Sequence, residues 1–237
     1  MKLEQHLVTG NSYARNIWYL PGPADTPHPL CIFLDGEHYW RDMEALTALK
    51  ELLTEPAIPP LSLLFVSHVA PGEGAPEYAA RRTADYTCDE RYAQFIAQDV
   101  VHWAVTRNRG TRTHGNVICG LSLSGLQSAY ITLLYPTVFS SCLSQSGSFW
   151  WLEGRDLRLP AAQAKFWLSV GDQETATGVA HSKELFQKVS QIAGVEKTAD
   201  ELRGRGGTVH YHKYSGGHAP APWREELAPA LRWLLTT

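Results

Sequence analysis

The sequence predicts an α/β fold whose central sheet is mostly parallel and covered by helices on both faces. Apolar, strand-like runs alternate with helical patterns along the 237 residues, which is typical of this fold class. The composition, 44% hydrophobic and 19% charged, is that of an ordinary globular protein. A chain of this length is normal for one α/β domain, so we expect residues 1–237 to form a single domain.

The strand candidates are short apolar runs between turn signals. They are Asn16–Leu20, Leu30–Leu34, Leu61–His68, Val117–Cys119, Ser140–Leu143, Phe166–Val170 and Val209–Tyr214. No helical pattern separates the first two runs, so we expect the sheet to begin with antiparallel pairing. The later strands are separated by helical patterns and are expected to run parallel.

The helix candidates show apolar residues at helical spacing. They are Met43–Leu53, Tyr92–Arg107, Leu123–Leu134, His181–Ala193 and Trp223–Leu235. The last carries an apolar stripe that includes Leu227, Leu231 and Leu234. Residues 70–87 show no such periodicity and contain several glycines and prolines, so we expect a long loop there that lines a site.

Charge and composition exclude several classes of function. A net charge of −3 argues against nucleic acid and anionic membranes as partners. The sequence shows neither a signal-peptide pattern nor an apolar run long enough to span a membrane. The four cysteines, Cys31, Cys88, Cys119 and Cys142, lack zinc or redox spacing, and we expect reduced thiols in a cytoplasmic protein. His38, His68, His102 and His114 also lack metal-ligand spacing, so we expect no cofactor and no metal.

The most informative segment runs from Val117 to Gly125, with the sequence VICGLSLSG. An apolar strand leads into a turn of small residues centred on Ser122, and a helical pattern follows. This order is typical of a nucleophile elbow, which holds a serine hydroxyl above the edge of an α/β sheet. Ser124 stands where glycine is usual, and we expect it to crowd the turn slightly. Ser122 is therefore the candidate nucleophile.

A nucleophilic serine needs a base and an acid that orients the base. Among the histidines that follow Ser122, only His218 lies in a loop, just beyond the last predicted strand. Open α/β sheets place their chemistry at such strand ends, so His218 is the candidate base. Asp172 and Glu174 follow the strand before it. Composition does not indicate which of these two carboxylates orients the histidine.

The oxyanion that forms when a serine attacks an ester needs backbone N–H donors. The residue after the nucleophile, Leu123, supplies one. The loop after an early central strand is expected to supply the second, and Gly36 and Glu37 lie in such a loop.

Several segments together resemble the catalytic domain of the enterochelin (enterobactin) esterases, the Fes-type branch of the esterase D superfamily. The matching stretches are LDGEH (34–38), RTADY (82–86), GLSLSG (120–125), LSQSGSFWW (143–151) and GGH (216–218), followed by Trp223 and Arg224. They occur in the order found in that family. The resemblance implies an α/β-hydrolase fold and ester hydrolysis without a cofactor.

The resemblance also implies roles for individual residues. It supports Ser122 and His218 and favours Glu174 over Asp172 as the acid. Arg82 corresponds to an arginine near the family's site and would suit an anionic, catecholate-bearing substrate. Trp150 and Trp151 are expected to wall the substrate pocket.

Two departures from the family's pattern limit how far the family's substrate can be assigned to this chain. Ser124 replaces the family's usual glycine. We also expect the chain to hold the catalytic domain alone, without the N-terminal siderophore-binding domain of the cytoplasmic enterochelin esterases. The expected partner is a small-molecule ester, with a ferric catecholate siderophore as the first candidate. Two alternatives stay open: a small-acyl, aryl or feruloyl carboxylesterase, and a non-catalytic binding module on a hydrolase fold. The sequence does not give the oligomeric state.

Overall fold

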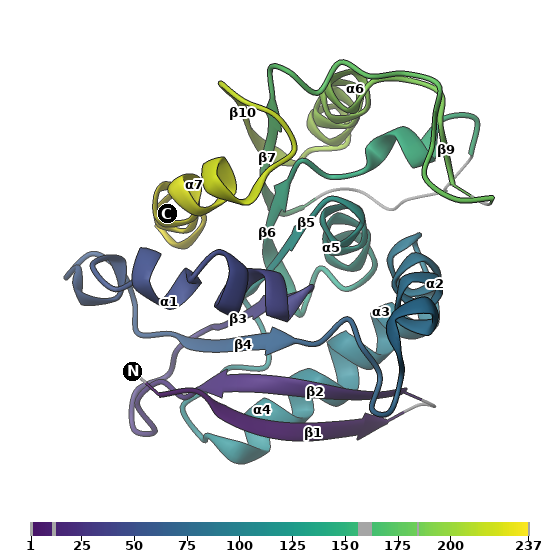
Figure 1. Ribbon diagram of the computed structural model, residues 1–237. Coiled ribbons are helices and arrows are strands. Elements are labelled where there is room, and N and C mark those ends of the chain that lie inside the picture. The colour runs from purple at the N-terminus through teal and green to yellow at the C-terminus, as the bar shows by residue number, and fades with distance from the viewer. Residues whose placement is uncertain (1, 11–12, 156–162, 184, 237) are drawn as a thin grey trace.

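The central sheet is mixed and mostly parallel. A computed structural model describes residues 2–10, 13–155, 163–183 and 185–236, and in this part of the chain eight strands form the sheet in the order β1-β2-β4-β3-β5-β6-β7-β10 (Figure 1). The strands are β1 (Glu4–Gly10), β2 (Tyr13–Leu20), β3 (Leu30–Phe33), β4 (Ser62–Val66), β5 (Asn116–Leu121), β6 (Phe139–Gln145), β7 (Lys165–Gly171) and β10 (Thr208–Tyr214). The pairs β1–β2 and β2–β4 are antiparallel, and every later pair is parallel. The expected α/β-hydrolase architecture, including its antiparallel start, is confirmed.

Helices cover both faces of this sheet (Figure 1). The α-helices are α1 (Ala45–Ala48), α2 (Ala75–Tyr86), α3 (Glu90–Gln94), α4 (Val101–Arg107), α5 (Leu123–Leu134), α6 (Gln191–Gly204) and α7 (Pro220–Leu235). A π-helical segment, η3 (Phe95–Val100), joins α3 to α4, and another, η1 (His38–Asp42), follows β3. The short 3₁₀ segments are η2 (Leu52–Thr54) and η4 (Phe149–Leu152), and β8 (Val179–Ala180) pairs with β9 (Phe186–Gln187) as a separate ribbon.

The alternation of side chains along each strand divides the core between the two faces. In β3, Leu30 and Ile32 pack with the α3–α4 side, whereas Cys31 and Phe33 pack with α1 and α7. Successive side chains of a strand point to opposite faces, so a strand buried on both faces must be apolar throughout. This requirement explains why the sequence of β3 is apolar at every position.

Three expected elements differ from the structure. Residues 181–193 do not form one helix: they contain the end of the β8–β9 ribbon, and helix α6 starts at Gln191. The segment expected as a loop at 70–87 contains helix α2, whose described side chains are mostly exposed or partly buried, so it has few apolar positions. The helix expected at Met43–Leu53 is reduced to α1 and η2. The strand β1 was not anticipated, because its half-exposed pattern is mostly polar.

No helix within the described residues is long and apolar enough to cross a membrane. All four cysteines are free thiols: Cys31, Cys119 and Cys142 are buried and Cys88 is partly buried. Burial of Cys31 and Cys119 on the α7 face of the sheet gives these thiols a packing role.

Candidate active site

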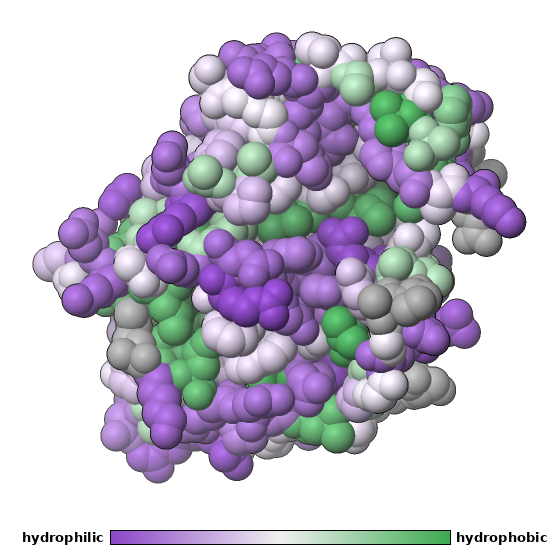
Figure 2. Space-filling view, viewed as in Figure 1, coloured by the Kyte–Doolittle hydropathy of each residue, from purple (hydrophilic) through white to green (hydrophobic). Residues whose placement is uncertain are grey.

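The residues singled out by the sequence meet at the carboxyl edge of the parallel strands. Ser122 follows β5, Glu174 lies three residues after β7, and His218 lies four residues after β10. Ser122, Glu174 and His218 all line one cavity of about 1060 Å³. Figure 2 shows apolar surface inside the hollow across the centre of this face, with polar residues around it. Strand ends far apart in the sequence are thus brought to one cleft.

Ser122 is held in a strained turn at the start of α5. Its φ and ψ are 55° and −124°, a conformation that a non-glycine residue rarely adopts. A Cβ at Gly120 would lie 2.1 Å from the Ser124 carbonyl oxygen, so only glycine fits there. The Ser122 N–H donates to the Gln145 carbonyl (2.9 Å), which ties the turn to β6. The backbone therefore fixes the position of the serine hydroxyl at the N-terminal end of α5.

Ser124 stabilises the turn, whereas the sequence led us to expect that it would crowd the turn slightly. Its hydroxyl accepts a hydrogen bond from the Leu121 N–H (2.9 Å) and donates to the Leu121 carbonyl (2.8 Å). The side chain thus closes the turn, and the close approach that needs a glycine falls one residue later. A Cβ at Gly125 would lie 2.8 Å from the Ser144 Oγ.

His218 and Glu174 form a tight pair. The His218 Nδ1 lies 2.6 Å from the Glu174 Oε2, and the Glu174 side chain is only 4% exposed, whereas that of His218 is 41% exposed. The His218 ring also rests edge-on against Trp223, 4.8 Å between centroids. Because Nδ1 faces the carboxylate, Nε2 is the nitrogen left for a reacting group. Asp172 instead accepts the Gly216 N–H, so it supports the loop that carries the histidine.

The other carboxylate oxygen of Glu174 is held by several donors. Oε1 accepts hydrogen bonds from the Gly171 N–H (2.8 Å), the Ser146 hydroxyl (2.7 Å) and the Tyr214 hydroxyl (3.0 Å). The Trp223 indole N–H donates in turn to both hydroxyls. Burial opposes ionisation of Glu174, but the bonds from His218 and Ser146 outweigh it and keep its pKa below the ordinary value. The carboxylate is therefore ionised and fixed in direction.

The loop after β3 passes tightly over the end of β4. A Cβ at Gly36 would lie 2.8 Å from the Phe65 carbonyl carbon, so the glycine is needed for this crossing. The buried Glu37 carboxylate accepts the Ser67 hydroxyl and the His68 N–H. Gly36 and Glu37 do not themselves line the cavity in the described part of the chain, although the next residue, His38, does.

Arg82 lines the cavity from helix α2, but its charge is already paired. Its Nε and Nη2 donate to the two carboxylate oxygens of the fully buried Asp35 at 2.8 and 2.6 Å. Burial opposes ionisation of Asp35, but the Arg82 guanidinium outweighs it and holds the pKa of Asp35 below its usual value. Any substrate anion at Arg82 would therefore meet an arginine fixed by Asp35.

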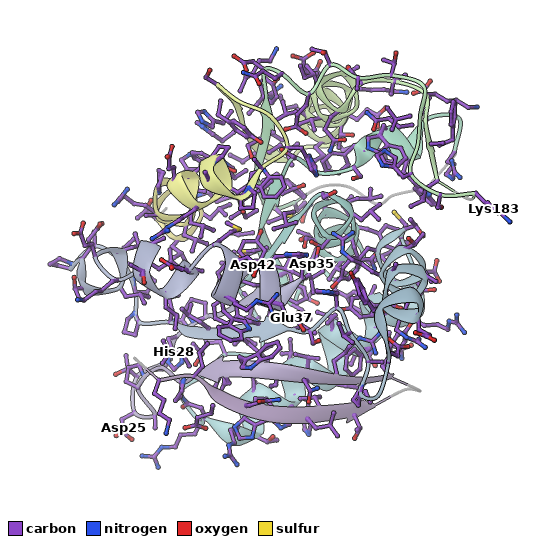
Figure 3. All side chains as sticks on the ribbon, viewed as in Figure 1. Asp25, His28, Asp35, Glu37, Asp42 and Lys183 are labelled. Atoms are coloured by element: carbon purple, nitrogen blue, oxygen red, sulfur yellow. The ribbon has the colours of Figure 1, made fainter. Side chains whose placement is uncertain are left out.

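The two tryptophans after β6 differ in position. Trp150 lines the cavity and stacks on His181 with ring centroids 5.1 Å apart. Trp151 is not among the described residues that line the cavity: it is partly buried, and Arg155 stacks over its ring at 4.2 Å. The β8–β9 ribbon forms the rim, and Figure 3 shows Lys183 at its tip, at the edge of the molecule.

Comparison with known proteins decides the family. The family model described as "Putative esterase" matches residues 11–234. This chain belongs to the esterase family. It is 30% identical to the iron(III) enterobactin esterase of Dickeya dadantii over 238 residues, which cover 94% of this chain and 52% of the relative. The chain thus spans about half the length of that relative.

Solved structures share the fold of this esterase-family chain. The enterobactin esterase of Shigella flexneri, crystallised in the presence of enterobactin, matches with a TM-score of 0.81 and 19% identity, over 99% of this chain and 59% of that chain. The BES protein of Bacillus cereus matches with a TM-score of 0.71 and 16% identity, over 100% and 97% of the two chains. The resemblance seen in the sequence is confirmed.

Sequence reasoning missed the residues that hold the acid. Ser146, which has a φ of 45°, and Tyr214 contact Glu174 from the ends of β6 and β10. Ser146 lies in the LSQSGSFWW stretch and Tyr214 ends a predicted strand, but no local pattern indicates that either hydroxyl reaches Glu174. His181 was also missed, because the expected helix hid its place on the ribbon at the cavity rim.

Proposed function

We propose that this chain is a serine ester hydrolase in which Ser122 is the nucleophile, His218 the general base and Glu174 the acid that orients it. The observation that carries the proposal is the His218–Glu174 pair at 2.6 Å, in the same cavity as a serine at a strained strand–helix turn. A nucleophile, a base and an orienting carboxylate on separate strand ends are the set that acyl transfer requires.

The proposed reaction proceeds in two halves. The Ser122 hydroxyl adds to the ester carbonyl carbon while its proton passes to the His218 Nε2. The carbonyl oxygen becomes an oxyanion next to the N–H of Leu123, which lies in the first turn of α5. As the second donor we propose the backbone of Gly36 and Glu37, which directly precedes the cavity-lining His38 in the chain. The C–O bond to the alcohol then breaks, and His218 returns the proton to the leaving oxygen.

The acyl-enzyme is hydrolysed by the same groups. His218 takes a proton from water, the hydroxide adds to the acyl carbon, and Ser122 leaves with that proton. In both halves the histidine carries a transient positive charge beside the ionised Glu174. No metal or cofactor takes part in these steps, which use the side chains and backbone of this chain.

As substrate we propose an ester of an aromatic, anionic acid, with ferric catecholate siderophore esters as the first class to test. The cavity is large, and its lining includes Lys183 and His181. The other charged groups are paired, Arg82 with Asp35 and Glu174 with His218. The stacked rings of Trp150 and His181, which both line the cavity, give its wall an aromatic character that suits an aromatic acid. Iron would arrive as part of such a substrate.

The first experiment tests the nucleophile. Ser122→Ala should lower kcat/KM for p-nitrophenyl butyrate by a factor on the order of 10⁴ to 10⁶, with unchanged unfolding. Ser148→Ala is the matched control, because its hydroxyl lies only 3.4 Å from that of Ser122. A fluorophosphonate probe should label wild type and Ser148→Ala but not Ser122→Ala. An unlabelled wild-type protein would instead favour the binding-module alternative.

The second experiment tests the substrate class. We expect kcat/KM for ferric enterobactin to exceed the values for methyl ferulate and p-nitrophenyl butyrate. A higher value for the feruloyl ester would favour the aryl esterase alternative, and a higher value for the butyrate would favour a small-acyl esterase. All three substrates should lose turnover together in Ser122→Ala.

A further inference from the structure

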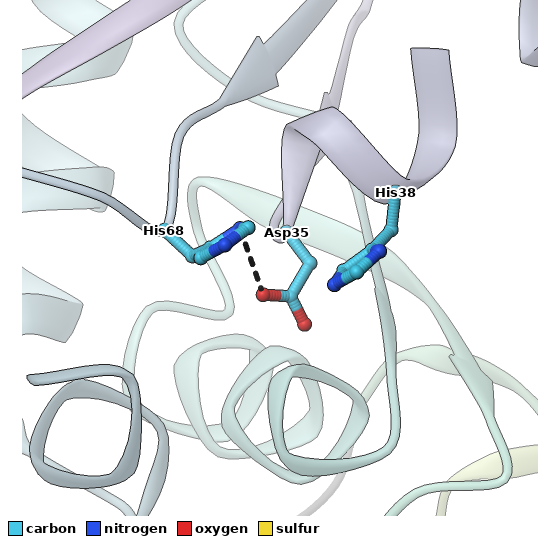
Figure 4. Close-up of side chains that lie close together, drawn as sticks. All are labelled: Asp35, His38 and His68. Atoms are coloured by element: carbon cyan, nitrogen blue, oxygen red, sulfur yellow. Dashed lines mark ion pairs between the residues drawn. The ribbon is translucent and has the colours of Figure 1, made fainter. Parts of the chain in front are cut away.

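Three side chains outside the Ser122 group converge next to the cavity, which one of them, His38, lines. Asp35 and His38 come from the loop after β3 and the η1 segment, and His68 follows β4. Each offers one ligand atom, and these atoms all lie within 4.8 Å of one another. Figure 4 shows both imidazole rings directed toward the Asp35 carboxylate from opposite sides. The parallel pairing of β3 with β4 brings the two loops to the same edge of the sheet.

His68 is the buried imidazole of this cluster, and two carboxylates face it. Its side chain is 9% exposed, and its Nδ1 is buried. That nitrogen lies 3.6 Å from the Asp35 Oδ1 and 3.0 Å from the Glu37 Oε2. The contact with Glu37 holds the His68 ring in the cluster, with the Asp35 carboxylate beside it.

His38 is oriented in the way that suits a ligand. Its Nδ1 lies 2.9 Å from the Asp42 Oδ2, so the other ring nitrogen is free to face Asp35. A carboxylate on the far nitrogen of an imidazole is the usual outer partner of a metal-binding histidine, because it fixes the ring and raises its basicity. Asp42 would act on His38 in this way.

The Asp35 carboxylate can serve both Arg82 and an ion. The guanidinium donates one bond to each oxygen. A carboxylate offers about four acceptor positions in all, so capacity remains on the side that faces the imidazoles. Asp35 and Glu37 bring two negative charges and Arg82 only one positive charge, which leaves a surplus negative charge next to the imidazoles.

We propose that Asp35, His38 and His68 bind a divalent transition-metal ion of the Zn²⁺ type. Two imidazoles and one carboxylate favour this class over Ca²⁺ and Mg²⁺, which take oxygen ligands. Bonds of about 2.0–2.2 Å place tetrahedral ligand atoms about 3.3 Å apart, so the cluster must contract slightly on binding. His38, whose side chain is 42% exposed, has the freedom to make that movement.

The ligands share a loop with the proposed oxyanion donors, but Zn²⁺ binding does not require hydrolysis and can be measured in the Ser122→Ala protein. Calorimetric titration with Zn²⁺ should show one specific site, and Co²⁺ should give visible absorption bands of a nitrogen- and oxygen-ligated ion. His38→Ala and His68→Gln should each weaken Zn²⁺ binding by at least about 10-fold, since losing a ligand costs no less than losing an outer partner. Asp42→Asn should weaken it less.

Two control variants distinguish Zn²⁺ binding at this site from adventitious binding at other histidines. His102→Ala removes an exposed imidazole from α4 and should bind Zn²⁺ as the parent does. His210→Ala disrupts a pair of imidazoles on β10, where the rings of His210 and His212 lie 6.4 Å apart and could hold an adventitious ion. The proposal is overturned if Zn²⁺ does not bind, or if binding survives His38→Ala and His68→Gln but is lost in His210→Ala. Unfolding curves of each variant without metal establish that it is folded.

Discussion

The buried carboxyl group of Glu226 should make the protein less stable as the pH rises. Glu226 lies on α7 and accepts hydrogen bonds from Gln145 (2.7 Å), Ser169 (2.5 Å) and Trp167 (3.3 Å). Burial is the dominant effect and raises the pKa of Glu226 from 4.5 to about 7. The folded protein therefore holds a proton that the unfolded chain has released between these two pH values.

The sign and size of the effect follow from this difference. The folded state binds more protons, so the free energy of unfolding falls as the pH rises through this window. With 1.36 kcal/mol for each pKa unit, Glu226 alone costs about 2.5 kcal/mol of stability between pH 5 and pH 8. The loss begins near pH 4.5 and levels off above about pH 7.

Glu226→Gln isolates this contribution, because an amide of similar shape does not titrate. Urea unfolding of wild type and variant at pH 5 and pH 8 gives the two free-energy differences. We expect the variant to gain about 2.5 kcal/mol relative to wild type on going from pH 5 to pH 8. Glu225→Gln, which removes an exposed carboxyl from the same helix, is the matched control for the loss of one charge. Equal differences at the two pH values would refute the reasoning.

Two further substitutions test the elbow and the support of Glu174. Tyr214→Phe removes one hydrogen-bond donor to the Glu174 Oε1. We expect kcat for an ester to fall roughly 10-fold with KM unchanged, because hydrogen bonds to charged groups contribute about 1.5–3 kcal/mol. An unchanged kcat would mean that the remaining donors suffice. Gly120→Ala should lower the free energy of unfolding by about 3 kcal/mol or more, because its Cβ would lie 2.1 Å from the Ser124 carbonyl oxygen. Gly204→Ala, with open space around the new Cβ, is the control, and similar urea curves for the two variants would contradict the steric argument.

Much of the site followed from local sequence signals, because each signal is a local physical requirement. The turn around Ser122 needs glycine at 120, and a helix must follow to point free N–H groups at the serine. His218 stood out because it alone among the later histidines follows a strand in a loop. These positions lie at strand ends, where a parallel sheet gathers its chemistry.

Local patterns failed where long-range contacts decide the structure. The helix expected at 181–193 has helical spacing, yet its first part pairs as a ribbon, with the His181 N–H bonded to the Leu185 carbonyl. Helix α2 has few apolar positions and is held in part by the Arg82–Asp35 pair, whose members are 47 residues apart. Tertiary contacts override local preference in such segments.

The sequence by itself determined the class of fold, the serine turn and the order of the serine, carboxylate and histidine, because backbone sterics and periodicity act within a few residues. Only the tertiary structure shows which carboxylate reaches the His218 Nδ1: Glu174 contacts it, whereas Asp172 accepts the Gly216 N–H. It also decided that Asp35, His38 and His68 meet at one point. Distances between strand ends arise from the order and register of the sheet, and no local pattern of residues encodes them.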